Sequence, residues 1–330
     1  MYEGRPKTST VLSARALLKR IPGLVTFIHR LRALWRESTI AVIAHGVAWG
    51  RKTPQRRRLI FSALREPLAI AVHPQESYIV NPTDKVIGGS LYAAGQFDFQ
   101  KFQTACRLIS VHAGLAPDAV LPDTVLIDAG ANIGSICIPA VKRGLVSRAI
   151  AFELDPDNVR LLKVNALLNG VDDRIDIRNL AVGAASGQVS IQRSAANFGD
   201  HRVLMTERAS GIAIDMIPLD SIADHLDLRK TILWMDVQGY EAYALQGAGR
   251  FMEAGVPLIT EFSRAELDSF DCFETFLTVI TTSGYRIFYD LNAVHPQAVP
   301  LSRAALHDLC DRLEQQNTFT DLLFLRGTAA

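Results

Sequence analysis

The sequence predicts an α/β protein built on a doubly wound, mostly parallel sheet, with a helical extension at its N-terminus. From Asp123 onward, short apolar runs alternate with stretches of helical periodicity, which is the order of parallel strands joined by helices. The apolar runs are continuous rather than alternating, as expected for strands buried on both faces. With 48% apolar and 21% charged residues among 330, the chain can bury such a core and is neither disordered nor collagen-like.

Charge and apolar patterning together divide the chain into three expected regions. Residues 1–65 carry 14 Lys and Arg against two acids, whereas residues 66–330 carry 21 against 32. A basic leader on an acidic body indicates that the two parts are used differently. We expect a basic helical extension over 1–65, a transition region of strands and a helix over 66–122 that packs on the core, and the main domain over 123–330.

The expected elements follow from apolar patterning and turn residues. In the transition region, strands are predicted at Leu68–Val72 and Ser77–Val80 and a helix at Asp98–His112. Strands of the main domain are predicted at Val125–Ile127, Ala149–Phe152, Ile175–Val182, Ile232–Met235, Leu258–Thr260, Tyr285–Tyr289 and Leu322–Leu325. Helices are predicted at Ile133–Lys142, Pro156–Leu168, Tyr240–Ala254 and Phe270–Thr282, and an added hairpin at Gln188–Gln192 and Ile212–Ile217.

The extension has the pattern of an amphipathic helix with a cationic face. Ile28, Leu31, Leu34 and Trp35 recur at helical spacings among several arginines. Such a helix could bind an anionic membrane surface, or it could pack on the main domain with its charges solvated. The run 39–50 is too short to cross a bilayer and reads as a buried helix. The basic run 56–58 has no aromatic platform beside it, so nucleic acid is not an expected partner.

The remaining composition points to a cytoplasmic protein. No apolar stretch is long enough to cross a bilayer, and the first residues lack the pattern of a signal peptide. The four cysteines, Cys106, Cys137, Cys272 and Cys310, form neither a CxxC pair nor a cluster with histidine, which argues against disulfides and a metal site. We therefore expect a cytoplasmic location, with peripheral contact at the inner membrane face through residues 1–65 as an open alternative.

A candidate ligand site lies where the first strand of the main domain ends. The segment from Val125 to Gly134 runs from an apolar strand through Asp128 and two glycines into a predicted helix. In open α/β sheets, ligands bind outside the carboxyl ends of the strands. Glycines there permit a tight turn and a close approach of the backbone, and the helix start offers free N–H groups to an anionic group. The segment therefore predicts a cofactor site that includes Gly130 and Gly134.

The type of cofactor follows from the neighbouring residues. A dinucleotide fingerprint needs glycine where this chain has Asn132 and Ser135, and Asp128 would repel a pyrophosphate. S-adenosylmethionine instead carries a positively charged ammonium and sulfonium, which a carboxylate attracts. Glu153, at the end of the second strand, stands where a carboxylate accepts both ribose hydroxyls of an adenosine ligand. We therefore expect S-adenosylmethionine as the cofactor.

At these residues the chain resembles the FkbM-type methyltransferases, a branch of the class I S-adenosylmethionine-dependent enzymes. The resemblance runs from roughly 123 to 262 and rests on Asp128–Gly134, Phe152-Glu153 with Pro156 and Asn158, Asn165, Asn197-Phe198-Gly199, Pro218-Leu219-Asp220, Met235–Glu241 with Leu245 and Gly247, and Glu261. It implies a Rossmann-like sheet of seven strands with an antiparallel last hairpin, and usually O-methylation of a hydroxyl. Gln238 stands where the family often has Glu, which weakens any case for a metal.

Three residues are candidates for the catalytic base. A hydroxyl acceptor is a poor nucleophile and gains from a group that takes its proton. Asp236 and Glu261 end the fourth and fifth strands, beside the place expected for the methyl group, although Asp236 could also orient the cofactor or cap the following helix. His201, in a segment that could cover the acceptor pocket, is the third candidate.

The complete prediction names one cofactor site and one acceptor. The expected cofactor-binding residues are Asp128, Gly130, Asn132, Gly134, Glu153, Asn179, Ala181 and Asp236, with Asn179 and Ala181 at the adenine. The expected acceptor is a hydroxyl of a sugar, in a glycan or small molecule, or of a natural product, and no metal is expected. Two alternatives stay open: a nicotinamide-dependent oxidoreductase on the same fold, and a scaffold that binds the cofactor without catalysis.

Overall fold

The computed structural model describes residue 30 and residues 53–116, 123–192, 202–204 and 212–327. The chain consists of two compact units, Met1–Arg57 and Arg58–Ala330. Of the first unit, the description covers only position 30 and residues 53–57. The run 39–50 and nearly all of the expected amphipathic helix therefore lie outside the described residues. No helix in the described part of the chain has the length and apolarity that a membrane span needs.

The second unit is organised around one large sheet. Its strands lie in the order β13-β12-β14-β11-β10-β3-β4-β5. Five are parallel to one another, namely β3 (Val125–Ala129), β4 (Arg148–Phe152), β5 (Ile175–Arg178), β10 (Thr231–Met235) and β11 (Leu258–Phe262). Three are antiparallel to their neighbours: β12 (Ile287–Asp290), β13 (Val299–Pro300) and β14 (Thr320–Leu325). The predicted mostly parallel sheet with an antiparallel last hairpin is confirmed, and the two-residue β13 adds a short edge strand.

The strand order reverses between β3 and β10. From β3 the chain first builds outward through β4 and β5, and then returns to build the other half from β10. Main-chain connections leaving β3 and β10 therefore diverge to opposite sides and leave room at the carboxyl edge of the sheet. Ligands of open α/β sheets bind at this place.

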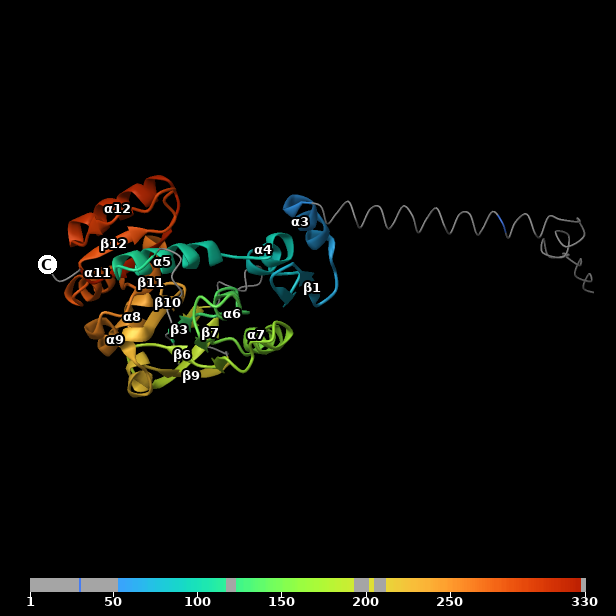
Figure 1. The fold of residues 1–330 in the computed structure, drawn as a ribbon, viewed down its shortest axis with the longest axis horizontal. Coiled ribbons are helices and arrows are strands. Elements are labelled where there is room, and N and C mark those ends of the chain that lie inside the picture. Colours follow the sequence, from blue (N-terminus) through green and yellow to red (C-terminus); the bar gives the residue numbers. More distant parts are fainter. Residues whose placement is uncertain (1–29, 31–52, 117–122, 193–201, 205–211, 328–330) are drawn as a thin grey trace, which may run out of the picture. The chain divides into compact units, whose positions relative to one another are not determined.

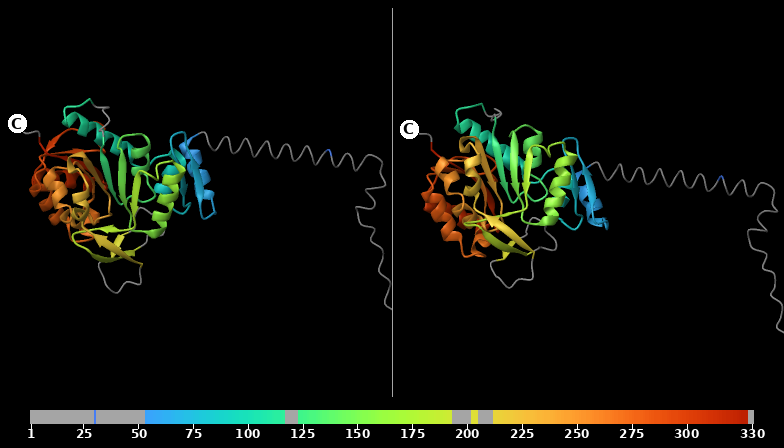
Figure 2. Two further views of the ribbon diagram at one scale, coloured as in Figure 1. Left: turned by 60° about the horizontal axis from the view of Figure 1, so that its bottom comes forward. Right: turned by 90° about the horizontal axis from the view of Figure 1, so that it is seen from below.

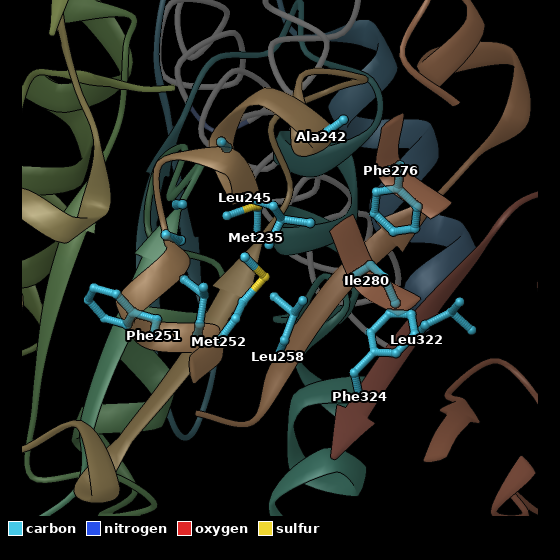
Figure 3. Packing of buried hydrophobic residues seen from close by; sticks show 14 of the residues in the cluster. Met235, Ala242, Leu245, Phe251, Met252, Leu258, Phe276, Ile280, Leu322 and Phe324 are labelled. Carbon is cyan, nitrogen blue, oxygen red and sulfur yellow. The ribbon is translucent and has the colours of Figure 1, made fainter. Parts of the chain in front are cut away.

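Helices cover both faces of the sheet (Figure 1). One face carries α8 (Glu241–Gln246), α9 (Gly249–Ala254), α11 (Phe273–Thr282) and α12 (Arg303–Gln315), with the short α10 (Arg264–Asp268) before α11. The other carries α5 (Phe99–His112), α6 (Cys137–Lys142) and α7 (Pro156–Leu168). On the first face, Met235 and Leu258 of adjacent strands lie among Leu245, Met252 and Phe276 of the covering helices (Figure 3). Burial of this continuous apolar layer is the main favourable contribution to the stability of the fold.

A small subdomain precedes α5. It contains the end of α3 (Pro54–Ala63), the hairpin of β1 (Ala69–Val72) and β2 (Ser77–Val80), and α4 (Ile87–Ala94). Two asparagines, Asn165 of α7 and Asn169 directly after it, form hydrogen bonds with the β2 backbone of the kind that a neighbouring strand would form. The Asn165 side chain accepts from the Ile79 N–H at 2.6 Å and donates to the Ile79 carbonyl at 3.2 Å, and Asn169 bonds Ser77 in the same way.

An ion pair adds to this attachment. Arg143, just after α6, holds the buried Glu76 through two hydrogen bonds of 2.8 and 2.6 Å. A bidentate pair of this kind fixes direction as well as distance. The subdomain is thus joined to the main sheet through side chains of α6 and α7. The domain boundaries drawn at 65/66 and 122/123 stay a prediction.

A second sheet lies beside the main one. Its strands are in the order β6-β9-β7-β8, with bounds Ala181–Val182 for β6, Gly187–Gln192 for β7, Arg202–Leu204 for β8 and Ala213–Ile217 for β9. Both views of Figure 2 show its yellow strands at the bottom, away from the green strands of the main sheet. The expected hairpin of residues 188–192 and 212–217 is present as the antiparallel pair β7 and β9. Two 3-10 turns, η1 (Leu219–His225) and η2 (Leu228–Lys230), lead back to β10.

Three predicted elements were wrong in their extent. The strand expected at Ile175–Val182 is two strands in different sheets, because the chain turns at Asn179 and Leu180. The helix expected from Ile133 begins only at Cys137. The helix expected at 240–254 is interrupted at Gly247, where a side chain would lie 2.0 Å from the Gly183 carbonyl oxygen.

Candidate active site

A pocket opens at the carboxyl edge of the sheet, where the strand order reverses. It is bounded by the ends of β3, β4 and β10, the start of β6 and the segment that leads into α5. The lining residues are Ile87, Phe97, Asp98, Gly130, Asn132, Ser135, Ile136, Phe152, Glu153, Leu154, Leu180, Ala181, Val182, Trp234, Asp236, Val237 and Gln238. Of the eight expected cofactor residues, this set contains five: Gly130, Asn132, Glu153, Ala181 and Asp236.

The glycines of the β3 turn are required by the protein's own packing. Gly130 has φ +89°, and a Cβ there would lie 1.8 Å from the Asp236 carbonyl oxygen. Gly134 has φ +96°, and a Cβ there would lie 2.4 Å from Cδ1 of Ile138. Neither distance involves a ligand. Gly130 lines the pocket, whereas Gly134 lies behind it and allows the turn to pack against α6.

Glu153 links the ends of the first two strands. Its Oε2 accepts a hydrogen bond from the Asn132 N–H at 2.8 Å, and its Oε1 accepts one from the Asp155 N–H at 2.8 Å. Asn132 adopts a left-handed φ of +49°, which points its N–H toward the carboxylate. Both residues line the pocket, so the structure brings together the two strand ends that the sequence paired.

Asp128 lies beneath the pocket rather than in its wall. The side chain is fully buried, and its Oδ2 accepts from the Cys137 N–H at 3.1 Å. Burial raises the pKa of this carboxyl to about 7. The first N–H of α6 therefore donates to Asp128, whereas the sequence predicted it to be free for an anionic group of the ligand. Oδ1 of Asp128 is buried and has no hydrogen-bond partner among the described residues.

The third strand end meets the pocket through Leu180 and Ala181. Asn179 does not line it. The Asn179 amide donates instead to the carbonyl oxygens of Glu153 and Leu154, both at 2.9 Å. This side chain holds the loop after β4 in position. A contact between the Asn179 side chain and an adenine ring is not what the geometry favours.

Three carboxyls lie in a row across the carboxyl edge: Glu261 and Asp321 are buried, and Asp236 is partly buried. Asp236 follows β10, and Glu261 of β11 pairs directly with Asp321 of β14. Burial and the negative neighbours raise the pKa of Asp236 to about 8 and that of Glu261 to about 11. Only Asp236 reaches the pocket wall. Burial also raises the pKa of Asp321, and Lys101 opposes that effect.

The loop after β10 is held by Glu241, the first residue of α8. Its Oε1 accepts from the N–H groups of Val237 at 3.0 Å and Gly239 at 3.2 Å, and burial raises its pKa to about 7. Glu241 thus fixes the loop before α8, and among the described residues the helix itself has no side-chain cap from Asp236 or any other residue. Asp236 is instead bonded by the side-chain amide of Gln238 at 2.5 Å. Gln238 thus replaces a possible carboxylate with a donor, and no cluster of three or more metal-ligand side chains occurs among the described residues.

The sequence prediction missed the part of the wall that precedes the main domain. Ile87, Phe97 and Asp98 line the pocket although they come about 30 residues or more before β3. The sequence predicts a turn before the helix at Asp98. It contains no local pattern that places this turn beside a site about 30 residues later. His201, the third candidate base, lies outside the described residues.

Comparisons with known proteins find similarity to methyltransferases. The sequence model of the FkbM methyltransferase domain matches residues 128–287. A tRNA (guanine(37)-N(1))-methyltransferase from Danio rerio is 37% identical over 92 residues, which are 28% of this chain and 18% of that protein. The chain thus matches less than a fifth of that relative's length.

The similar solved structures are distant in sequence. A methyltransferase FkbM from Methylobacillus flagellatus is 20% identical, with 61% of this chain and 44% of that chain covered and a TM-score of 0.38. A SAM-dependent O-methyltransferase from Thermotoga maritima is 12% identical, with 77% and 75% covered and a TM-score of 0.37.

Proposed function

Since residues 128–287 belong to the FkbM methyltransferase family, we propose that this protein is an S-adenosylmethionine-dependent methyltransferase that methylates a hydroxyl of a sugar, in a surface glycan, or of a natural product. The observation that carries the proposal is the pocket at the strand reversal. Its acidic lining residues are Asp98, Glu153 and Asp236, and neither Lys nor Arg occurs among the lining residues. Such a wall suits a ligand with a positive end.

The lining residues fit the parts of S-adenosylmethionine. When bound, this cofactor supplies a methyl group on a positively charged sulfur. Glu153 is placed to accept hydrogen bonds from ribose hydroxyls, and Leu154, Leu180 and Val182 offer an apolar surface to the adenine. The same wall counts against a nicotinamide dinucleotide, because its pyrophosphate would face carboxylates.

Asp236 is the best-placed candidate for the base. It is the one member of the carboxyl row that lines the pocket, and a pKa near 8 is matched to proton transfer close to neutral pH. Glu261 lies behind it and, with its higher pKa, holds a proton where Asp236 can give one up. The main task of the protein is then to hold the acceptor hydroxyl in line with the methyl and the sulfur.

Charge favours a neutral acceptor over a nucleic acid. The relative from Danio rerio acts on tRNA by its name, which makes an RNA base the second candidate acceptor. Proteins that bind RNA or DNA neutralise phosphates with Lys and Arg. Acids line this pocket, and a sugar or natural-product hydroxyl meets no such repulsion.

Mass spectrometry tests the acceptor. Surface glycans, small metabolites and tRNA from a deletion strain and its parent would be compared for the loss of one methyl group. A loss confined to glycans or small metabolites supports the proposal. A loss confined to tRNA would replace the acceptor, and the purified protein with each fraction and labelled cofactor would confirm which one accepts the methyl.

The cofactor is tested separately from the acceptor. Fluorescence titrations with S-adenosylhomocysteine and with NADH distinguish the methyltransferase from an oxidoreductase. Tight binding of NADH alone would overturn the proposal. Binding of S-adenosylhomocysteine without methylation of any fraction would favour a scaffold that keeps the pocket but does not catalyse.

Peripheral membrane contact is a further part of the proposal. In the second unit, Leu68, Ile70 and Val72 expose apolar side chains shortly after the basic extension in sequence. Basic and apolar residues together favour anionic bilayers. Co-sedimentation of the full chain and of a chain lacking residues 1–65 with anionic vesicles tests this, and equal recovery of the two would end the idea.

A further inference from the structure

Lys101 of α5 joins the carboxyl row to the pocket wall. Its Nζ lies 2.8 Å from Oδ1 of Asp98 and 2.5 Å from Oδ2 of Asp321. The Lys101 side chain is 19% exposed and that of Asp321 5%, so the contact is shielded from water. An ion pair in such a place is stronger than one on the surface. The two carboxylates together hold the pKa of Lys101 above its usual range.

Asp98 has an unusual backbone for its position. It precedes α5 with a left-handed φ of +55°, which disfavours residues other than glycine. An Asp before a helix commonly caps it, yet this side chain makes no cap hydrogen bond. It turns instead to Lys101, whose N–H also bonds the Asp98 carbonyl at 2.9 Å. Asp98 is thus held where it lines the pocket beside Phe97.

We propose that Lys101 is a positioning residue: it holds Asp98 in the pocket wall, so that a segment preceding the matched domain completes the cofactor site. The inference rests on the proposed function, because it assigns Asp98 to the positive end of the cofactor. Asp128 lies beneath the wall and is engaged by Cys137, which leaves Asp98 and Asp236 as the wall carboxyls near the ends of β3 and β10.

Charge explains why the bridge needs a cation. Asp98 and Asp321 share Lys101, and Asp236 and Glu261 lie in the same row. Without Lys101, Asp98 would lose its cation, would face only Asp321 and other acidic groups on its inner side, and would turn toward water. The left-handed turn would lose the contact that offsets its strain, and the wall would open at Phe97 and Asp98.

Calorimetric titration of the full chain with S-adenosylhomocysteine tests the inference. We expect Lys101→Met and Asp98→Asn each to raise Kd roughly tenfold, as for the loss of one charged hydrogen bond. Lys101→Arg should restore near-normal binding. The double variant should bind no worse than the weaker single variant, because Lys101 acts through Asp98.

A matched control separates positioning from general stability. The pair Arg143 and Glu76 also joins residues before the matched domain to it, away from the pocket. Glu76→Gln removes the negative charge of that pair and keeps Arg143 over the Phe99 ring, 4.6 Å from its centroid, so it should lower Tm while Kd stays unchanged. If this control weakens binding as much as Lys101→Met, Lys101 has only a structural role and the inference is overturned.

The outcomes distinguish this inference from the function on which it rests. If the unaltered protein binds neither S-adenosylmethionine nor S-adenosylhomocysteine, the proposed function fails and the inference with it. If it binds while Lys101→Met binds equally well, or if the two single effects add in the double variant, only the inference fails. Should Lys101→Met not fold, Asp98→Asn decides: normal affinity overturns the inference, and weakened affinity together with normal binding by Lys101→Arg supports it.

Discussion

Glu261 and Asp321 stand directly opposite each other on the antiparallel strands β11 and β14, with both carboxyls buried. Like charges in such a pair are destabilising when both are ionised. Lys101 compensates Asp321, and no cation is recorded at Glu261 among the described contacts. The protein therefore keeps Glu261 protonated, and the proton it holds links the stability of the fold to pH.

Stability should fall as pH rises from about 4.5. The folded-state pKa of Glu261 is near 11 and that of Asp236 near 8, both far above their ordinary values. Between the ordinary pKa of each carboxyl and its raised pKa in the folded state, the folded protein binds more protons than the unfolded chain. The free energy of unfolding therefore decreases as pH rises through that range. We expect Glu261→Gln to flatten this decrease and to be about 1–4 kcal/mol more stable than the unaltered protein at alkaline pH. Calorimetric melts from acid to alkaline pH measure it, and parallel curves for the two proteins would contradict the assignment.

Activity should rise with pH, whereas stability falls, because the proposed base Asp236 must lose its proton. A base works in its deprotonated form, so kcat should rise with pH through about 8. Asp236→Asn should lower kcat about 10²–10⁴-fold with a small effect on the Kd of S-adenosylhomocysteine. The exposed Asp224, which pairs with Arg250, provides the control Asp224→Asn. Full activity of Asp236→Asn would move the search for the base to His201.

Glu153→Ala should weaken cofactor binding and the fold together. The side chain is proposed to meet the ribose, and it also accepts from two backbone N–H groups. Removing a charged hydrogen-bond partner costs about 1–3 kcal/mol. Titration at a temperature well below Tm separates the two effects, and Glu153→Gln, which keeps the length of the side chain, should lose affinity with a smaller loss of stability. Unchanged affinity in both variants would mean that the adenosine lies elsewhere.

Asn165→Ala should destabilise the protein without touching the pocket. Asn165 is fully buried, bonds both backbone groups of Ile79 and donates to the Ile133 carbonyl at 3.0 Å. Leaving these groups unpaired should cost about 2–4 kcal/mol. Chemical denaturation measures the loss, with the exposed Asn292→Ala as a control expected within about 0.5 kcal/mol of the unaltered protein. Equal stability of the two variants would show that β2 does not depend on α7.

The strands of the main sheet could be predicted because each is marked by a short run of consecutive apolar residues. Runs such as Leu258–Thr260 are continuous and apolar, and they are buried on both faces as that pattern requires. The spacing of the acid at Glu153 after the glycine turn likewise predicted its place at the second strand end. What the sequence could not supply was pairing between distant segments: Asn165 with β2, and Asp98 with the pocket.

The misplaced boundaries have a related cause. The helix was predicted from Ile133, but Asn132 and Gly134 adopt positive φ in the turn along the pocket wall, so α6 begins at Cys137. The amphipathic α12 was missed although Leu306, Leu309, Cys310 and Leu313 recur at helical spacing. That signal was present in the sequence. The turn at Asn132 was not, because tertiary contact with Glu153 overrides local preference there.

The closest approach in the site gives the sharpest test of the fold. Gly130 has φ +89° and would place a Cβ 1.8 Å from the Asp236 carbonyl oxygen, a distance that backbone must move to relieve. Gly114 has a similar φ of +73° but nothing within 4 Å of the same point, so Gly114→Ala carries the left-handed strain alone. We expect Gly114→Ala to cost about 1–2 kcal/mol and Gly130→Ala to cost more than about 4 kcal/mol or to prevent folding. Chemical denaturation of both variants measures the difference, which is the cost of the clash between the added Cβ and the Asp236 carbonyl. Equal costs would mean that the ends of β3 and β10 lie farther apart than the structure has them. Gly130 and Asp236 would then not form one pocket wall.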